Sequence, residues 1–167
     1  LTLYGHPFSS YTQKVLVALH EFGLPFDFRC ISPEHPDNSA EWLARWPLRK
    51  FPLLVDGERD VVETSIIIEY LQRAHPVPVR LLPDDAMAAL DVRFMDRFFD
   101  LHVMDAAQCA VDGAITGDAT RARNGMARSV AKLERAYDWL ETRLAGMTWA
   151  TGEHFTLADC AAAPSLF

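Results

Sequence analysis

The sequence predicts a chain of two parts, an α/β domain followed by an all-helical domain. Strand and helix patterns alternate over residues 1–74, and strand patterns end there. The next segment, 75–84, is expected to be a linker, because its three prolines cannot continue a helix. Long stretches with helical apolar spacing then fill residues 85–167, which we assign to the helical domain.

The first domain has the element order β-α-β-α-β-β-α, which is that of a thioredoxin-like fold. Strands are predicted at 1–5, at 26–31 and on either side of a turn at residues 56–57. Helices are predicted at 9–22, 40–44 and 64–74. In the first of these helices Val15, Leu19 and Phe22 recur at helical spacing, and Gly23 is a typical residue to end it.

The second domain is expected to contain two long helices, at 85–112 and 119–145. Each carries an apolar stripe, formed by Leu90, Phe94, Phe98 and Leu101 on the first and by Met126, Val130, Leu133, Tyr137 and Leu140 on the second. A third helix begins after Phe155. There Thr156 is expected to cap the amide of Asp159, while the Asp159 carboxylate accepts from the amide of Thr156.

Composition excludes several classes of protein. Half of the 167 residues are hydrophobic and the net charge is -7, which argues against nucleic acid or an anionic membrane as the main partner. No apolar run is long enough to span a bilayer, and the first residues, Leu1 to Tyr4, show no basic region typical of a secretory signal, so a cytoplasmic location is expected. The three cysteines form no Cys-x-x-Cys pair, and the six histidines show no metal-ligand spacing, so no metal is expected.

The segment 50–66 is the most informative part of the chain. Pro52 opens a strand, where a missing N–H costs least, and Phe51 before it keeps an N–H and a C=O that a peptide ligand can pair with. Glu63 and Thr64 begin the helix that follows, and a helix N-terminus attracts anions. The alternative interpretation is an ordinary hairpin followed by a capped helix.

In pattern and spacing the whole chain resembles the glutathione transferase superfamily. The resemblance implies a cis-proline at Pro52, with the backbone of Phe51 paired to the cysteinyl unit of glutathione. It also implies that Glu63 and Thr64 hold the γ-glutamyl end, although serine is commoner than threonine there. Lys50 occupies a position from which family members often contact glutathione. The alternative interpretation is that Lys50 is simply a solvent-exposed residue at a strand edge. The family normally continues through further helices, so the helical domain is expected to be incomplete at residue 167.

Glutathione chemistry requires a thiolate, and hydroxyl donors at a helix N-terminus can stabilise one. In the serine-type classes the catalytic hydroxyl lies six residues before the valine that matches Val15, and this count implies Ser9. Ser10 is the nearest alternative as the catalytic hydroxyl, and Tyr4 is a further one. The alternative interpretation of Ser9 is that it only caps the helix. The loop resembles the phi-type branch, whereas the Ser9–Ser10 pair resembles the zeta-type branch, in which a cysteine stands in place of Tyr11.

The resemblance implies a cytosolic glutathione transferase in detoxification, with glutathione as co-substrate, a small hydrophobic electrophile and a homodimeric state. A glutathione-dependent isomerase, dehalogenase or peroxidase, or a non-catalytic binding module, remains open as an alternative.

Further residues are candidates for contacts with the substrates. The glycyl carboxylate of glutathione requires a cation, for which Arg49, His35 and Lys50 are the candidates. The electrophile pocket is expected between the first loop and the long helix. Candidates for its lining are Phe98, Phe99, His102, Val103 and Ala106, and for most of them the favoured alternative is a place in the core or at a dimer contact. Asp96 and Asp100 are expected at the surface, or in reach of the γ-glutamyl amine across a dimer.

Overall fold

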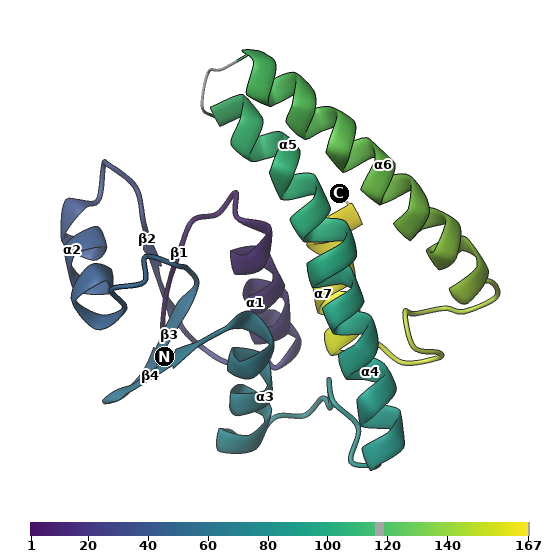
Figure 1. Ribbon diagram of the computed structural model, residues 1–167. Helices are drawn as coiled ribbons and strands as arrows, with labels where there is room; N and C mark the ends of the chain where they lie inside the picture. The colour runs from purple at the N-terminus through teal and green to yellow at the C-terminus, as the bar shows by residue number, and fades with distance from the viewer. Residues whose placement is uncertain (116–118, 167) are drawn as a thin grey trace. The chain divides into compact units, whose positions relative to one another are not determined.

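The computed structural model describes residues 1–115 and 119–166. It forms two compact units, Leu1–Pro83 and Asp84–Phe167 (Figure 1). Most of the segment expected as a linker lies in the first unit. Leu82 exchanges two hydrogen bonds with the side chain of Gln72, at 2.8 and 2.9 Å, and it is buried together with Leu81.

In the described residues of the first unit, one four-stranded sheet has the order β2-β1-β3-β4. Its strands are β1 Thr2–Gly5, β2 Asp27–Cys30, β3 Leu53–Asp56 and β4 Arg59–Val62. β1 is parallel to β2 and antiparallel to β3, and β3 is antiparallel to β4. The thioredoxin-like arrangement expected from the element order is confirmed.

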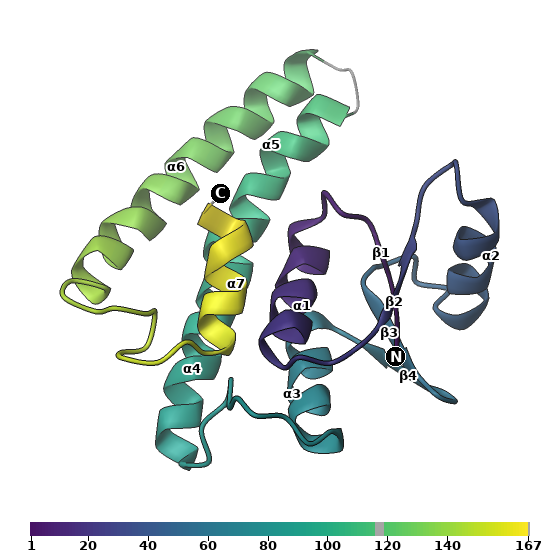
Figure 2. The ribbon, with the colours of Figure 1, turned by 180° about the vertical axis from the view of Figure 1, so that it is seen from behind.

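Helices cover both faces of this sheet. Helices α1 Ser10–Glu21 and α3 Thr64–Ala74 pack together on one face, and α2 Pro36–Arg45 lies on the other (Figures 1 and 2). Because side chains alternate along a strand, neighbouring residues of β1 enter different cores. Tyr4 packs with Trp42 of α2 in one of these cores, and Leu53 and Val55 of β3 join them.

The second unit is helical throughout its described elements. They are α4 Ala86–Phe98, η1 Phe99–Met104, α5 Asp105–Ile115, α6 Ala119–Arg143 and α7 Leu157–Leu166. The first three follow one another without a break, as expected for one long helix, but η1 has π-helical hydrogen bonding. α6 packs along α5, and α7 packs on α4 and η1 (Figure 2).

The burial pattern of the long helix differs from the expected stripe. Leu90, Phe94 and Leu101 are about half exposed, at 55%, 50% and 51%. The buried face is formed instead by residues that include Ala89, Val92, Met95, Phe99 and Val103. Helical spacing identifies an apolar face but not which of two such faces packs inward, and the wider π-turn changes the phase from residue 99 onward.

Two carboxylates of this helix also correct the sequence analysis. Asp96 and Asp100, expected at the surface, are only 1% and 5% exposed. Asp100 pairs with Arg97 at 3.5 Å, and both residues take part in further interactions, although Oδ1 of Asp96 is buried without a hydrogen bond to any described residue. Aspartate is usually exposed and is seldom fully buried, so the residue type alone predicted the wrong environment for these two side chains.

At the start of α7, half of the expected capping box forms. The Asp159 carboxylate accepts from the amides of Thr156 and Ala150, both at 2.8 Å. The Thr156 hydroxyl donates to the same carboxylate at 3.0 Å rather than accepting from the amide of Asp159. Among the described helices none is long and apolar enough to cross a membrane.

Candidate active site

Three segments that the sequence singles out converge at one end of the sheet. In the antiparallel ladders Tyr4 lies opposite Leu53, and Leu53 lies opposite Val62. The chain therefore leaves β1, enters β3 and leaves β4 at the same edge. The loop that holds Ser9, the Phe51–Pro52 step and the Glu63–Thr64 step are brought together in this way, although they are far apart in the sequence.

Phe51 presents an unpaired main chain at this edge. Its N–H and C=O have no hydrogen-bond partner among the described residues, because the β3 ladder begins only at Leu53. The Phe51–Pro52 peptide bond is cis, and Pro52 is buried. The phenyl ring of Phe51 packs against Trp42 at 5.7 Å between centroids, and the Trp42 indole N–H donates to the Lys50 carbonyl at 3.1 Å. Trp42 thus holds this segment, while the amide and carbonyl of Phe51 keep their hydrogen-bonding capacity unused among the described residues.

The N-terminus of α3 lacks a side-chain cap. Glu63 is the N-cap residue, but its carboxylate makes no capping hydrogen bond. Its backbone lies in the left-handed region, with φ 68° and ψ 118°, which is a strained conformation for a residue other than glycine. Thr64 follows at 9% exposure as the first helical residue. Uncapped amides at a helix N-terminus form a site for an anion.

Lys14 supplies a buried positive charge beside this helix start. It is 1% exposed, and its ammonium donates to the hydroxyl of Ser65, the second residue of α3, at 3.0 Å. Lys14 was not among the site residues expected from the sequence. Its signal was present, because Lys14 lies four residues before the buried Ala18 and so falls on the core face of α1.

Ser9 is the N-cap of α1. Its hydroxyl oxygen accepts from the amide of Thr12 at 3.3 Å, and its own amide donates to the carbonyl of His6 at 2.9 Å. The capping interpretation therefore holds, and it does not compete with a catalytic role. A hydroxyl that accepts one bond still has its proton to donate. Ser10 is the first residue of α1, and its hydroxyl makes no hydrogen bond with the described residues.

Tyr4 belongs to the core between the sheet and α2. It is 2% exposed and packs with Trp42 and Leu53. Burial, together with a hydrogen bond to Glu41, raises the pKa of the Tyr4 phenol to about 12. Because Tyr4 packs against α2, on the face of the sheet opposite α1, this alternative to Ser9 is not placed at the site.

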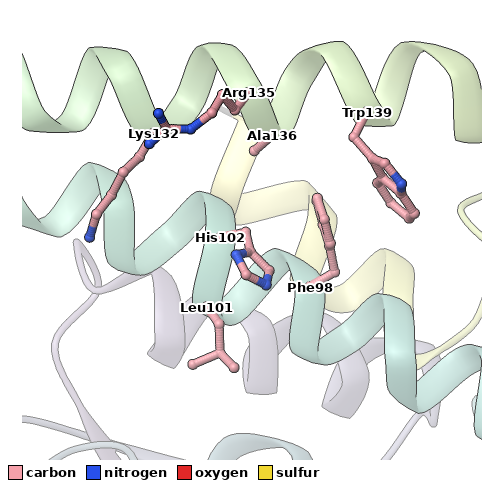
Figure 3. Close-up of a pocket in the computed structure, with 7 residues that line it drawn as sticks. All are labelled: Phe98, Leu101, His102, Lys132, Arg135, Ala136 and Trp139. Atoms are coloured by element: carbon pink, nitrogen blue, oxygen red, sulfur yellow. The ribbon is translucent and has the colours of Figure 1, made fainter.

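The remaining expectations divide between the two units. Arg49, Lys50 and His35, the candidates for a glycyl carboxylate, are exposed, and Arg49 has a φ of 58°. In the second unit Phe99, Val103 and Ala106 are 0% exposed. They belong to its core, which is the alternative that the sequence had left open for them, and they line no pocket in the described part of the chain. The other two candidates, Phe98 and His102, line a pocket within the second unit, between the α4–η1 run and α6 (Figure 3).

The comparisons with known proteins agree on one family. Residues 3–79 match the family model for the glutathione S-transferase N-terminal domain, and residues 123–167 match that for its C-terminal domain. Glutathione S-transferase F6 of Arabidopsis thaliana is 28% identical over 95% of this chain and 78% of its own length. The GST-like protein YibF of Escherichia coli is 30% identical over 90% of this chain and 73% of its own length. The crystal structure of a glutathione S-transferase from Methylobacillus flagellatus with GSH bound has a TM-score of 0.82 at 28% identity, over 99% of this chain and 80% of that one.

Proposed function

The chain belongs to the glutathione transferase superfamily, and on this premise we propose that it activates the thiol of glutathione for attack on a hydrophobic electrophile. The observation that carries the proposal is the unpaired main chain of Phe51. It lies at the same sheet edge as the uncapped start of α3 and the hydroxyl of Ser9. These features match the three parts of a tripeptide that has an anionic end, a peptide backbone and a sulfur.

In this proposal the cysteinyl unit of glutathione lies beside Phe51. Its backbone accepts from the Phe51 amide and donates to the Phe51 carbonyl, as a short added strand does. The γ-glutamyl carboxylate binds the first amides of α3 and the hydroxyl of Thr64, where the helix dipole and the Lys14 ammonium favour negative charge. The Glu63 carboxylate, which caps no amide, accepts from the γ-glutamyl ammonium.

Ser9 then donates its hydroxyl proton in a hydrogen bond to the sulfur. A free thiol has a pKa of ~8.5, and lowering it by about two units requires roughly 2.7 kcal/mol of stabilisation of the thiolate. A hydrogen bond to a charged acceptor contributes about 1.5–3 kcal/mol, and the dipole of α1 adds about 0.3–1 kcal/mol. The two together reach the required magnitude without a charged catalytic side chain.

The thiolate sulfur forms a new bond to an electrophilic carbon of the substrate. In a displacement, the bond from that carbon to its leaving group breaks, and the leaving group departs with the electron pair. Phe8, next to Ser9 in the same loop, is 87% exposed, and its ring gives an apolar substrate a surface to pack on. Phe8 was not expected as a site residue, since a single aromatic residue in a loop forms no recognisable pattern.

The first prediction is that Ser9→Ala lowers kcat for glutathione conjugation of 1-chloro-2,4-dinitrobenzene by about 10- to 100-fold. A decrease of this size in kcat corresponds to the free energy of one lost hydrogen bond to the thiolate. The Kd for glutathione should change little, because the tripeptide is held by Phe51 and α3. The loss of the helix cap is expected to reduce the stability of the fold by about 1 kcal/mol. Stopped-flow kinetics, calorimetric titration and urea unfolding measure the three quantities.

Ser10→Ala is the matched control, since it removes a neighbouring hydroxyl that caps nothing. The assignment of Ser9 requires Ser10→Ala to keep nearly full turnover, and Ser9→Thr to retain more turnover than Ser9→Ala. Equal turnover in Ser9→Ala and the unmodified protein would remove Ser9 from the mechanism. A Ser9→Ala protein that no longer binds glutathione would make Ser9 a binding residue instead.

A further inference from the structure

Gly5, the last residue of β1, and Thr12, in the first turn of α1, touch across the loop that holds Ser9. A Cβ atom added to Gly5 would lie 2.6 Å from Cγ2 and 2.7 Å from Oγ1 of Thr12. Two carbon atoms in contact are normally about 3.5–4.0 Å apart, so the two residues leave no room for a side chain at position 5. The φ of Gly5 lies outside the left-handed region, and glycine is therefore required here for space and not for its backbone freedom.

The Thr12 side chain cannot turn away from Gly5. It is 0% exposed, and its Cβ, Cγ2 and Oγ1 all lie within 3.2 Å of the position of the added Cβ. A β-branched residue carries two heavy atoms on Cβ, so every change of χ1 rotamer leaves one of them facing Gly5. The distance between the end of β1 and the first turn of α1 is therefore set by this contact.

The Thr12 hydroxyl contributes volume to this contact and no hydrogen bond. Within the part of the chain that the structure describes, its Oγ1 is buried and has no hydrogen-bond partner. A buried hydroxyl without a partner is unfavourable, and a valine would fill the same space without that cost. Thr12 is therefore expected to act through the shape of its two branches.

The backbone of Thr12 orients the hydroxyl of Ser9. Oγ of Ser9 accepts from the Thr12 amide at 3.3 Å, which is already long for an N–H···O bond. Two further bonds fold the loop, from the Ser9 amide to the His6 carbonyl at 2.9 Å and from the Gln13 side-chain amide to the Pro7 carbonyl at 3.0 Å. A shift of the first turn of α1 away from the sheet would thus break the bond that orients the Ser9 hydroxyl.

We propose that Thr12, packed against Gly5, is a positioning residue that holds the Ser9 hydroxyl where the thiolate of glutathione requires it. This inference rests on the proposed function of Ser9. It adds a requirement that the volumes at positions 5 and 12 match each other. A displacement of about 1 Å caused by a residue away from the chemistry can lower a rate by about 100-fold, so a contact one helical turn from Ser9 is close enough to control turnover.

The test is a cycle of variants at the two positions. Gly5→Ala forces a methyl group against Thr12 and should lower kcat for conjugation of 1-chloro-2,4-dinitrobenzene by about 10- to 100-fold. The Kd for glutathione should change little, since Phe51 and α3 are untouched. In G5A/T12A the nearest remaining atom is Cβ of residue 12, at 3.2 Å, which has to give by only a few tenths of an ångström. The kcat of the double variant should therefore return to within about threefold of that of the unmodified protein.

Two single variants test Thr12 without adding atoms at position 5. Thr12→Ala leaves a gap against Gly5 and should lower kcat by about three- to tenfold, with the Kd for glutathione unchanged. Thr12→Val keeps both branches and removes the unsatisfied hydroxyl, so it should retain nearly full kcat and raise the urea midpoint of unfolding. Thr142→Ala is the control, because it truncates an exposed threonine of α6, and it should leave kcat unchanged.

Action through Ser9 is tested by repeating Gly5→Ala in the Ser9→Ala protein. There it should cause no further loss of kcat, because the hydroxyl that it displaces is already absent. The position of Ser9 is also read without turnover, from hydrogen exchange at the amide of residue 12, which donates to the Ser9 hydroxyl. Exchange should be faster in Gly5→Ala than in the unmodified protein and slow again in G5A/T12A.

Four results would overturn the inference. They are full kcat in Thr12→Ala, a loss in Gly5→Ala that G5A/T12A does not reverse, a large loss of kcat in Thr12→Val, or a further tenfold loss when Gly5→Ala is added to Ser9→Ala. Circular dichroism checks that each variant is folded. An active Ser9→Ala protein would contradict the proposed function, whereas the exchange rates would still decide whether the contact holds Ser9 in place.

Discussion

Lys14 is the residue whose role the structure changes most. Its side chain is 1% exposed, yet lysine is among the residues least often fully buried. A buried ammonium normally requires compensation, and here the Ser65 hydroxyl at 3.0 Å supplies part of it. Because the ammonium lies next to the start of α3, its positive charge adds to that of the helix dipole at the same place.

The second prediction concerns this charge. Lys14→Met keeps a long unbranched side chain and removes the ammonium, and it should raise the Kd for glutathione by about tenfold. A tenfold change corresponds to about 1.4 kcal/mol of lost attraction for the γ-glutamyl carboxylate. Calorimetric titration measures it. Arg73→Met, which removes an exposed cation in the last turn of the same helix, should leave the Kd unchanged. An unaltered Kd in Lys14→Met would leave Lys14 with a structural role alone.

The third prediction separates Tyr4 from the chemistry. Its phenol packs against α2, and burial with the Glu41 hydrogen bond raises its pKa to about 12. Tyr4→Phe should therefore leave kcat for conjugation within about twofold, while the loss of one hydrogen bond lowers the free energy of unfolding by about 1 kcal/mol. A loss of kcat comparable to that of Ser9→Ala would return Tyr4 to the active site.

At the scale of the elements, a cluster of side chains links strand β3 to helix α3. Asp56, at the end of β3, accepts from the Tyr70 hydroxyl at 2.8 Å and lies 2.8 Å from Nε2 of His75. The Tyr70 hydrogen bond, followed by the His75 contact, lowers the pKa of the Asp56 carboxyl below its usual value. Phe51 lies just before β3 and Thr64 begins α3. The cluster therefore ties together, at the opposite end of the sheet, the two elements that position two of the three proposed glutathione contacts.

The fourth prediction follows from the sign of that pKa shift. A carboxyl with a depressed pKa stabilises the fold above its unfolded pKa of about 3.9, and the stabilisation is lost as pH falls through the lower folded value. Asp56→Asn should therefore be destabilised relative to the unmodified protein at pH 7, and the difference should shrink below about pH 4. Urea unfolding at pH 7 and pH 3 measures it.

Asp27→Asn serves as the control for that experiment. Asp27 pairs with Arg29 at 2.6 Å, but the two side chains are 58% and 45% exposed, and an exposed pair contributes little. Its removal should change the stability by less than about 1 kcal/mol at pH 7. A destabilisation by Asp56→Asn that is equal at both pH values would mean that packing, rather than the ionised carboxylate, accounts for it.

The helical elements show what sequence periodicity omits. A single long helix was expected at 85–112, and the described chain is helical through residue 115, but with a π-turn from Phe99 to Met104. No sequence pattern signals the extra residue in that turn, since the hydrogen-bond shift depends on packing against neighbouring helices. Asp96, which precedes this turn, and Asp100, which lies within it, were missed because aspartate is seldom fully buried.

At the scale of the whole molecule, element order predicted the fold well. Strands and helices of the first unit were placed within a few residues, because alternation, helical spacing and turn residues act locally. The site was predicted as separate motifs, at Ser9, at Phe51–Pro52 and at Glu63–Thr64. Their meeting at one sheet edge depends on strand pairing between distant residues, such as Tyr4 with Leu53, and a local pattern does not specify it. The pocket between α4–η1 and α6 could not be found for the same reason.

The fifth prediction tests the central claim, that glutathione pairs with the main chain of Phe51. In a ¹H–¹⁵N NMR titration, glutathione should move the amide signals of Phe51, Thr64 and Ser65, and binding should slow hydrogen exchange at the Phe51 amide. An analogue with alanine in place of cysteine should do the same, since this pairing needs no sulfur. Saturating glutathione that leaves the Phe51 amide unshifted and equally fast to exchange would contradict the account.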